Sequence, residues 1–222
     1  MGHIPGDTGN LSTLEYLEAI SQAFDYRVRN YGETAAGVLW KNDHGQKLRF
    51  EILTGLLDAE PSSGAISIND FGCGYGAFYD FLQGLPQMPD MDYMGFDISP
   101  EMIRLAEPRS AIGKAAFALS PLATRDADYT FVSGTFNLRL DAPDEPWNDF
   151  IKSSLAHLWS KTTKGLAFNM LATDHRNKQD GLYYADEMAF LDFCKGFSED
   201  VTLIDDYPLD EWTIFIRRCP RP

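Results

Sequence analysis

The segment AISINDFGCGYGA, residues 65–77, carries three glycines at alternate positions directly after a short apolar run. The run has the pattern of a buried β-strand, and the residues after Gly76 have the pattern of a helix. Glycine tolerates positive φ angles and lets ligand atoms approach the backbone, while a helix N-terminus offers free N–H groups. A strand, a glycine turn and a helix in this order predict a binding site for a nucleotide-like cofactor.

An acidic residue at the end of the next predicted strand supports this interpretation. Asp97 lies 21 positions after Gly76. In nucleotide-binding sheets of this kind, a carboxylate about 20 residues beyond the glycines accepts hydrogen bonds from ribose hydroxyls. The sequence GCGYGA also matches the fingerprint of nicotinamide dinucleotide sites, so the glycines alone leave the cofactor open.

Strands and helices alternate along most of the chain, which is typical of an α/β protein with a parallel sheet covered on both faces. The last two strands are separated only by PLD, so they must be antiparallel neighbours. Two helices, 12–32 and 46–57, are expected before the glycine turn. The expected strands are 65–71, 92–98, 115–122, 128–136, 165–171, 201–207 and 211–218, and the later helices are 78–85, 99–107, 146–161 and 185–197.

Length and composition predict one globular domain, 1–222, made of an N-terminal helical cap (1–60) and a core (64–219). The formal net charge of −14 and the pI of about 4.6 disfavour nucleic acid and anionic membranes as partners. No run of about 18 apolar residues and no signal-peptide pattern is present. The three cysteines are too scattered for a disulfide framework or a metal site, so we expect reduced thiols, no metal and a cytoplasmic location.

Three features together resemble the class I S-adenosylmethionine-dependent methyltransferases. NDFGCGYG resembles the first motif of that family, and MGFDISPEMI resembles its second strand, ribose-binding acid and following helix start. The closing antiparallel hairpin resembles its last two strands. The resemblance covers about residues 64–219. It implies a Rossmann-like sheet of seven strands in the order 3-2-1-4-5-7-6, with strand 7 antiparallel, helices on both faces and an N-terminal helical extension.

The resemblance also implies a binding site for S-adenosyl-L-methionine. In that family the glycine turn lies against the methionine part of the cofactor, and the acid before the turn organises it or meets the cofactor's ammonium through water. The acid after the second strand binds the ribose, and the residue after that acid lies against adenine. In this order, the corresponding residues are Gly72, Gly74 and Gly76, then Asp70, Asp97 and Ile98.

The adenine contact departs from the family pattern. Many members carry an acid after the third strand that binds the adenine amino group. Here the expected third strand leads into Ser120 and Pro121, and the nearest acids, Asp126 and Asp128, come later. The residue that binds the adenine amino group therefore stays open.

The methyl acceptor is expected beyond the ends of the fourth and fifth strands. The long polar segment 172–186, together with the segment around Tyr31 and Trp40, has the character of a lid. A base is needed only if the acceptor must lose a proton. The catalytic candidates are His175 and Tyr183, the candidate acceptor contacts are Tyr31, Trp40, Phe136 and Tyr184, and Glu211 is a further candidate in the same region.

The sequence therefore predicts a methyltransferase that uses S-adenosylmethionine and acts on an oxygen or nitrogen of a small soluble acceptor. No nucleic acid, membrane or metal partner is expected. Two alternatives remain: a nicotinamide-dependent oxidoreductase with the same glycine turn, and a non-catalytic regulator that binds S-adenosylmethionine. The sequence identifies neither the acceptor nor the oligomeric state.

Overall fold

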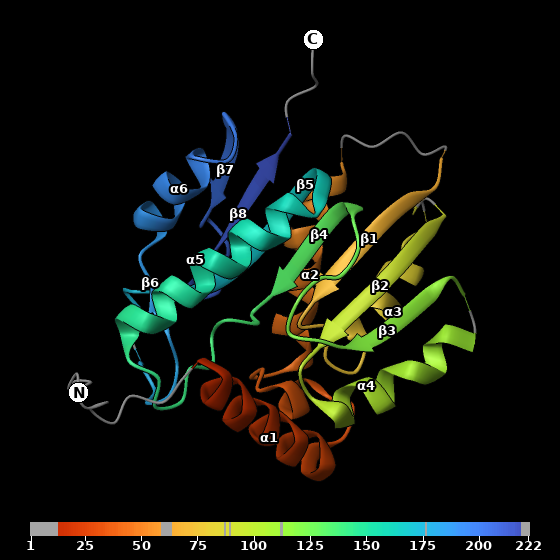
Figure 1. The fold of residues 1–222 in the computed structure, drawn as a ribbon, viewed down its shortest axis with the longest axis horizontal. Coiled ribbons are helices and arrows are strands. Elements are labelled where there is room, and N and C mark those ends of the chain that lie inside the picture. The colour runs from red at the N-terminus through yellow and green to blue at the C-terminus, as the bar shows by residue number, and fades with distance from the viewer. Residues whose placement is uncertain are drawn as a thin grey trace, which may run out of the picture.

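A central β-sheet organises the computed structural model, which describes residues 13–58, 64–86, 88, 90–111, 113–175 and 177–218 (Figure 1). The strands lie in the order β3-β2-β1-β4-β5-β8-β7, and β6 pairs with β5 outside this path. The strands are β1 (Ile66–Phe71), β2 (Met91–Asp97), β3 (Ala115–Leu119), β4 (Ala127–Ser133), β5 (Thr162–Ala172), β6 (Tyr184–Ala185), β7 (Asp200–Ile204) and β8 (Glu211–Arg217).

The strand directions confirm the predicted topology. Strands β1 to β5 run parallel to one another, and β8 is antiparallel to both β5 and β7. The order is the predicted 3-2-1-4-5-7-6 once the short β6 is set aside, with β8 as the seventh strand of the prediction. Sequence analysis missed β6 because two residues are too few to show an alternating pattern.

Helices follow the predicted plan with small shifts. Ser99 caps α4 by accepting a hydrogen bond from the Met102 amide at 3.1 Å, as expected from its place before Pro100. Among the described residues, no helix is both long and apolar enough to cross a membrane. The helices are α1 (Thr13–Tyr31), α2 (Asp43–Thr54), α3 (Ala77–Gln83), α4 (Pro100–Ala106), α5 (Asp144–Ser160) and α6 (Glu187–Lys195), with 3₁₀ helices η1 (Ala35–Val38), η2 (Gly55–Leu57) and η3 (Glu107–Ala111).

Helix α2 begins three residues before the predicted start at Gln46. The side chain of Asn42 caps it by accepting a hydrogen bond from the Gly45 amide at 2.7 Å. Asp43, His44 and Gly45 are weak helix formers, so their sequence has the appearance of a connector. The cap and the packing of α2 on the sheet outweigh that local preference.

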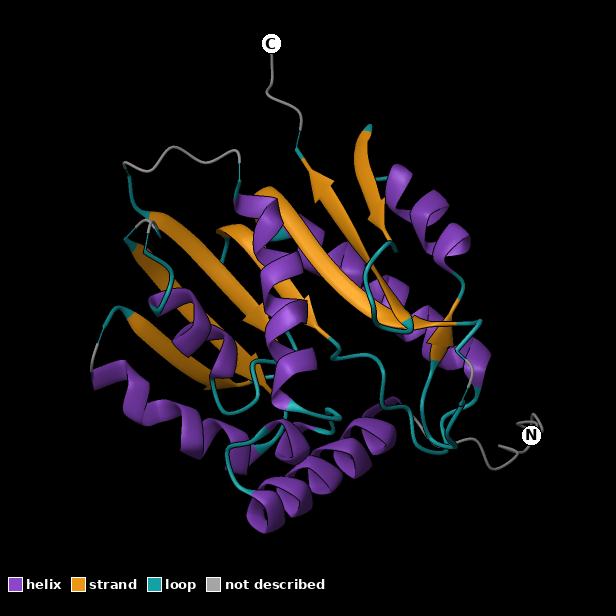
Figure 2. Cartoon of the chain, turned by 180° about the vertical axis from the view of Figure 1, so that it is seen from behind, coloured by secondary structure: helices purple, strands orange, loops and turns teal. Residues whose placement is uncertain are grey.

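Helices cover both faces of the sheet, and the two sets of helices are seen best from opposite sides (Figures 1 and 2). Helices α5 and α6 pack on one face, and α2 and α3 pack on the other. Consecutive residues of β4 show the division: Phe131 packs against Phe78 of α3, and Val132 belongs to the cluster that contains α5. Strands buried on both faces explain the near-continuous apolar runs in the sequence.

Helix α1 lies along the edge of the sheet at which β1 to β4 end (Figure 1). The Ser21 hydroxyl donates to the Ile98 carbonyl at 2.8 Å, which ties α1 to the loop after β2. The Asp25 carboxylate accepts from the Ser99 hydroxyl at 2.5 Å and from the Glu101 amide at 3.2 Å. These contacts place α1 over the carboxyl ends of the strands.

Candidate active site

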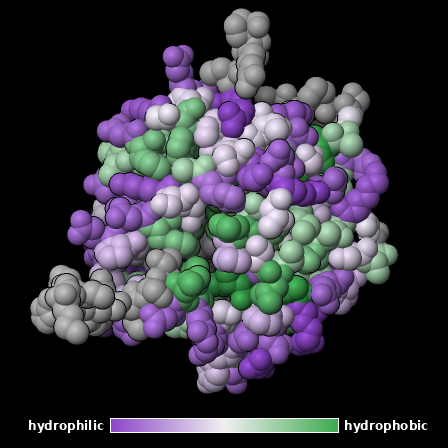
Figure 3. All heavy atoms as spheres, in the orientation of Figure 1, coloured by the Kyte–Doolittle hydropathy of each residue, from purple (hydrophilic) through white to green (hydrophobic). Residues whose placement is uncertain are grey.

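A cavity of about 640 Å³ opens at the carboxyl ends of the parallel strands. The residues after β1, β2 and β4 form its floor, and residues of α1, α2 and the segment between them form its roof. Residues of the segment 171–184 close one side. Figure 3 shows hydrophobic side chains gathered around a hollow between α1 and α5. The volume lies within the range of about 300–1,000 Å³ that is usual for small-molecule sites.

The glycine turn is sterically required. Gly72, Gly74 and Gly76 have φ angles of 79°, 54° and 90°, in the left-handed region that side chains rarely adopt. A Cβ atom on Gly72 would lie 2.2 Å from Thr135 Oγ1, and one on Gly76 would lie 2.8 Å from Arg109 Cδ. Gly72 and Gly74 line the cavity, whereas Gly76 begins α3 outside the lining.

The carboxylate of Asp97 joins two neighbouring segments of the site. One oxygen accepts from the Gly74 amide at 2.9 Å, and the other accepts from the Ser99 amide at 2.8 Å. Burial raises the pKa of Asp97, and these backbone hydrogen bonds oppose the rise. Because a carboxylate offers about four lone-pair positions, Asp97 keeps acceptor capacity for a ligand. Asp97 and Ile98 both line the cavity.

Asp70 lies beneath the glycine turn and is almost fully buried. The Tyr93 hydroxyl donates a hydrogen bond to its carboxylate. Burial raises the pKa of Asp70 to about 7, and the Tyr93 hydrogen bond opposes this rise. Asp70 also lines the cavity. It is therefore a titratable group near neutral pH next to the turn.

The acids after the third strand lie away from the cavity. Asp128 accepts from the Ser67 amide at 3.0 Å near the start of β1, which is the opposite edge of the sheet, and Asp126 directly precedes β4. Ser120 and Pro121 line the cavity instead. Within the described ranges, no three His, Cys, Asp or Glu side chains cluster closely enough to hold a metal ion.

A closed circuit of contacts holds Trp40 over the end of β4. The Arg49 guanidinium lies 3.9 Å from the indole centroid of Trp40, and its Nε lies 2.7 Å from a carboxylate oxygen of Glu211. The Asn169 side chain donates to Glu211 at 3.0 Å and accepts from the Gly134 amide at 2.9 Å. A Cβ atom on Gly134 would lie 2.2 Å from Trp40 Cη2, so the indole ring rests on this glycine.

The ion pair in this circuit is buried. The side chain of Arg49 is 10% exposed and that of Glu211 is fully buried. Burial raises the pKa of Glu211, and Arg49 opposes the rise. Sequence analysis proposed Trp40 and Glu211 separately, but it missed Arg49 and Asn169. No local pattern links residues 162 positions apart, such as Arg49 and Glu211.

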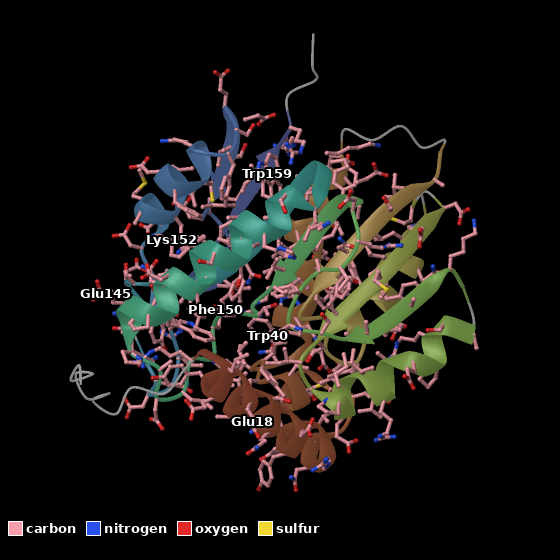
Figure 4. All side chains as sticks on the ribbon, viewed as in Figure 1. Glu18, Trp40, Glu145, Phe150, Lys152 and Trp159 are labelled. Atoms are coloured by element: carbon pink, nitrogen blue, oxygen red, sulfur yellow. The ribbon has the colours of Figure 1, made fainter. Side chains whose placement is uncertain are left out.

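Three of the four predicted acceptor contacts, Trp40, Phe136 and Tyr184, line the cavity. Figure 4 shows Trp40 between α1 and α5, close to Phe150, which also lines the cavity. Tyr31 does not line it: the side chain is 49% exposed and stacks under Arg27 at the end of α1. Of the four predicted acceptor contacts, the structure therefore brings Trp40, Phe136 and Tyr184 to the cavity and leaves Tyr31 outside it. Contact of these residues with an acceptor stays a prediction.

His175 lines the cavity and has partners at both ring nitrogens. Nδ1 accepts from the Asn177 amide at 3.1 Å, and Nε2 lies 3.7 Å from a carboxylate oxygen of Asp210. The ring also contacts the Tyr184 ring edge to face at 5.3 Å between centroids. Because Nδ1 accepts from Asn177, the neutral ring carries its proton on Nε2, so Nδ1 must release the Asn177 amide before it can take a proton from a ligand. Its role as a base stays a prediction.

Tyr183, the second catalytic candidate, does not line the cavity. It is buried in the main hydrophobic core, where burial raises the pKa of its hydroxyl and Asn148 of α5 opposes the rise. Its backbone amide donates to the Asn137 carbonyl at 2.8 Å. The structure thus places Tyr183 behind the cavity wall, where it supports Asn137, and no observation brings its hydroxyl to a ligand.

Comparisons with known proteins agree with this architecture. No protein-family model matches the chain. The Mycobacterium tuberculosis protein named "Putative methyltransferase Rv1506c" is 42% identical over 157 residues, which cover 69% of this chain and 93% of that protein.

Two solved structures show the same fold. The magnesium protoporphyrin IX methyltransferase of Synechocystis PCC 6803 with bound S-adenosylmethionine has a TM-score of 0.66 at 17% identity, covering 96% of this chain and all of the other. The Burkholderia thailandensis 1,6-didemethyltoxoflavin-N1-methyltransferase with bound 1,6-didemethyltoxoflavin and S-adenosylhomocysteine has a TM-score of 0.65 at 16% identity, covering 96% and 93%.

The sheet order, the glycine turn and the carboxylate after β2 define the fold and site of a class I methyltransferase. The mycobacterial relative is 42% identical over 93% of its own length, which shows that the two proteins share a family as well as a fold. The chain belongs to the class I S-adenosylmethionine-dependent methyltransferases.

We expect the free energy of unfolding to decrease as the pH rises from about 4 to about 7, with Asp70 as a main cause. The pKa of Asp70 is about 7 in the folded protein and 3.8 ordinarily, so the folded protein binds more protons in this window. Protonated Asp70 in the folded protein is the source of this stabilisation. It is fully present below the ordinary pKa of an aspartate and is lost as the pH rises through the pKa of Asp70 in the folded protein. It amounts to roughly 4 kcal/mol at most.

Urea unfolding across this pH range measures the effect. Asp70→Asn can still accept from Tyr93 but cannot ionise, so its profile should be flatter than that of the wild type. Glu211, whose pKa burial also raises, contributes equally to both proteins and cancels in the difference. Asp97 acts on Asp70 through its negative charge, so the difference reports on the two aspartates together. Asp126→Asn, at an exposed position, is the matched control. Parallel profiles for the wild type and Asp70→Asn would show that Asp70 stays ionised throughout.

We further expect Glu211→Ala to destabilise the fold by about 3–5 kcal/mol, because it leaves the Arg49 charge buried without its partner. Glu211→Gln should cost less, since its amide oxygen can still accept from Arg49. Urea unfolding, followed by circular dichroism, measures the change. The control Asp192→Ala breaks an exposed pair with Lys195 and should stay within about 1 kcal/mol of the wild type. Equal losses in both alanine variants would contradict a structural role for the buried pair.

Proposed function

We propose that the protein transfers a methyl group from S-adenosylmethionine to an oxygen or nitrogen of a small soluble acceptor. One observation carries the proposal: the glycine turn at Gly72 and Gly74 and the carboxylate of Asp97 share a cavity with a separate aromatic wall. The cavity is therefore divided into a polar side suited to a nucleoside and an apolar side suited to a second ligand.

The residues on the polar side fit the cofactor. Asp97 keeps lone pairs that can accept from ribose hydroxyls while it holds Gly74 and Ser99. Ile98, Ser120 and Pro121 offer a surface for the adenine ring. When bound, S-adenosylmethionine supplies a methyl group on a positively charged sulfur. Both solved neighbours are named as complexes with this cofactor or its demethylated product, which supports the same ligand here.

The residues on the apolar side would orient the acceptor and exclude water. Trp40 is fixed by the Arg49 circuit, and Phe136 and Phe150 lie across α5 and the end of β4. Alignment of two reactants in a dry pocket can supply much of the rate of a displacement reaction. If the acceptor must lose a proton, His175 is the candidate base, after Nδ1 releases the Asn177 amide.

Two further observations support a small acceptor. The net charge of −14 opposes binding of a polyanion. The Burkholderia neighbour is named as a complex with a small molecule, 1,6-didemethyltoxoflavin. The relationship to a methyltransferase argues against the oxidoreductase alternative, and a non-catalytic regulator is tested by the transfer assay below.

We expect Asp97→Ala to weaken binding of S-adenosylhomocysteine by about ten- to a hundredfold, or roughly 1.5–3 kcal/mol for hydrogen bonds to a charged group. Isothermal calorimetry measures the affinity. Asp92→Ala is the matched control, because Asp92 lies on the same strand near its opposite end and pairs with Arg125. Binding of NAD(H) or NADP(H), with no heat from S-adenosylhomocysteine, would refute the cofactor assignment.

The transfer assay uses S-adenosylmethionine labelled in its methyl group and an extract separated into small metabolites, lipid, nucleic acid and protein. We expect label in the small-metabolite fraction with the wild type and the Asp92→Ala variant, and much less with Asp97→Ala. Label only in RNA or DNA would refute the small acceptor. Binding of the cofactor without transfer to any fraction would favour the regulatory alternative.

A further inference from the structure

Asn137 follows β4 on the floor of the cavity and is 6% exposed. Its backbone amide donates to the Gly134 carbonyl at 3.1 Å, and its carbonyl accepts from the Tyr183 amide at 2.8 Å. Its side-chain oxygen accepts from the Leu171 amide at 3.2 Å. These three bonds fix both the backbone of Asn137 and the orientation of its side-chain amide.

The other half of that amide has no partner among the residues that the structure describes. Asn137 Nδ2 is buried and makes no hydrogen bond to them. Since Oδ1 is committed to Leu171, the free group must be the N–H donor and cannot be the carbonyl. Buried donors in native proteins are almost always paired, and an unpaired donor lowers stability. An unpaired donor on a residue that lines a cavity therefore points to an acceptor atom on a molecule bound in that cavity.

The surroundings of Asn137 Nδ2 indicate what kind of molecule brings that atom. An ideal Cβ on Gly134 would lie 3.2 Å from Nδ2 and 2.2 Å from Trp40 Cη2, so the amide and the indole flank one glycine. Ser133 Oγ, at the end of β4, is also buried without a partner among the described residues. Phe150 and Leu138 extend the lining as apolar wall. A hydrogen-bond donor thus lies at the edge of an aromatic surface.

We propose that Asn137 recognises the methyl acceptor by donating from Nδ2 to a carbonyl oxygen or another lone pair of a flat, largely apolar molecule packed against Trp40. The proposal rests on the proposed function, because it assigns the apolar side of the cavity to the acceptor. It makes Asn137 a specificity-determining residue. A protonated amine at this position is excluded, since its N–H groups would face the amide donor.

Probe molecules test the proposal without knowledge of the natural acceptor. The probes are acetophenone and 1-tetralone, each paired with the hydrocarbon of the same shape, ethylbenzene or tetralin. Their affinities for the full chain saturated with S-adenosylhomocysteine are measured by ligand-detected NMR, and the ¹⁵N side-chain amide signal of Asn137 is followed. We expect each ketone to bind more tightly than its hydrocarbon and to shift this signal, which the hydrocarbon leaves in place.

Asn137→Asp keeps an oxygen for the Leu171 amide but replaces the donor, so it should weaken ketone binding about tenfold, the effect of losing one hydrogen bond, and leave hydrocarbon binding unchanged. Asn148→Asp is the matched control: Asn148 Oδ1 is also buried without a partner among the described residues, but Asn148 lies outside the cavity lining. If Asn137→Asp does not fold, Asn137→Ala tests the loss of the donor, with circular dichroism as the check on folding.

The proposal is overturned if the ketones bind no better than the hydrocarbons, if neither ketone binds up to its solubility limit, or if the Asn137 variants bind ketones as the wild type does. The last result would mean that an ordered water pairs with Nδ2. Failure of the cofactor assignment is seen separately, as loss of S-adenosylhomocysteine binding by the wild type. In that case the ketone titration is made on the free protein and still decides the role of Asn137.

Discussion

The carboxylate of Asp97 is the contact on which the polar half of the site depends. It holds the Gly74 amide of the turn after β1 and the Ser99 amide at the start of α4. Ser99 in turn donates to Asp25, so the same chain of hydrogen bonds reaches α1 in the roof of the cavity. One side chain therefore sets the relative positions of a glycine turn, a helix start and a covering helix. A ligand bound to this carboxylate would be held by groups that already restrain one another.

A different set of contacts holds the apolar half of the site in place. Here the roof is tied to the sheet through Arg49 and Glu211, and the tie ends in an aromatic ring, Trp40, that rests on Gly134. A buried ion pair often adds little net stability, because desolvation offsets the attraction, but its geometry is well defined. The pair therefore fixes Trp40 beside the Asn137 side chain, whatever its net contribution to stability.

Two acids, Asp70 and Asp97, line the cavity, and a third, Glu211, lies buried beside Arg49 outside the lining. Burial raises the pKa values of Asp70, Asp97 and Glu211 alike. Arg49 compensates Glu211, whereas the groups that act on Asp70 are the Tyr93 hydroxyl and the negative charge of Asp97. A cationic ligand near the glycine turn would favour the ionised form of both aspartates. This is the electrostatic setting expected for a positively charged cofactor, and it is consistent with the family to which the chain belongs.

The sequence by itself determined the features that depend on local pattern. The strand and glycine turn at 65–77, the position of Asp97 and the closing hairpin follow from periodicity, spacing and a short connection, which act between neighbours in the chain. The family resemblance that these features carry implied the sheet order, which the structure confirms, whereas the contacts to the cofactor stay a prediction. The start of α2 was placed three residues late because the Asn42 cap outweighs the weak helix formers after it.

Only the tertiary structure decided the roles that arise from contacts between distant segments. The pairing of Arg49 with Glu211, the burial of Tyr183 behind the wall and the exclusion of Tyr31 from the cavity depend on how helices pack against the sheet. The amide of Leu171 orients the Asn137 side chain, whose Nδ2 then meets no acceptor in the part of the chain that the structure describes. Such contacts carry no local sequence signal, since packing geometry alone decides which side chains meet and which polar atoms are left unpaired.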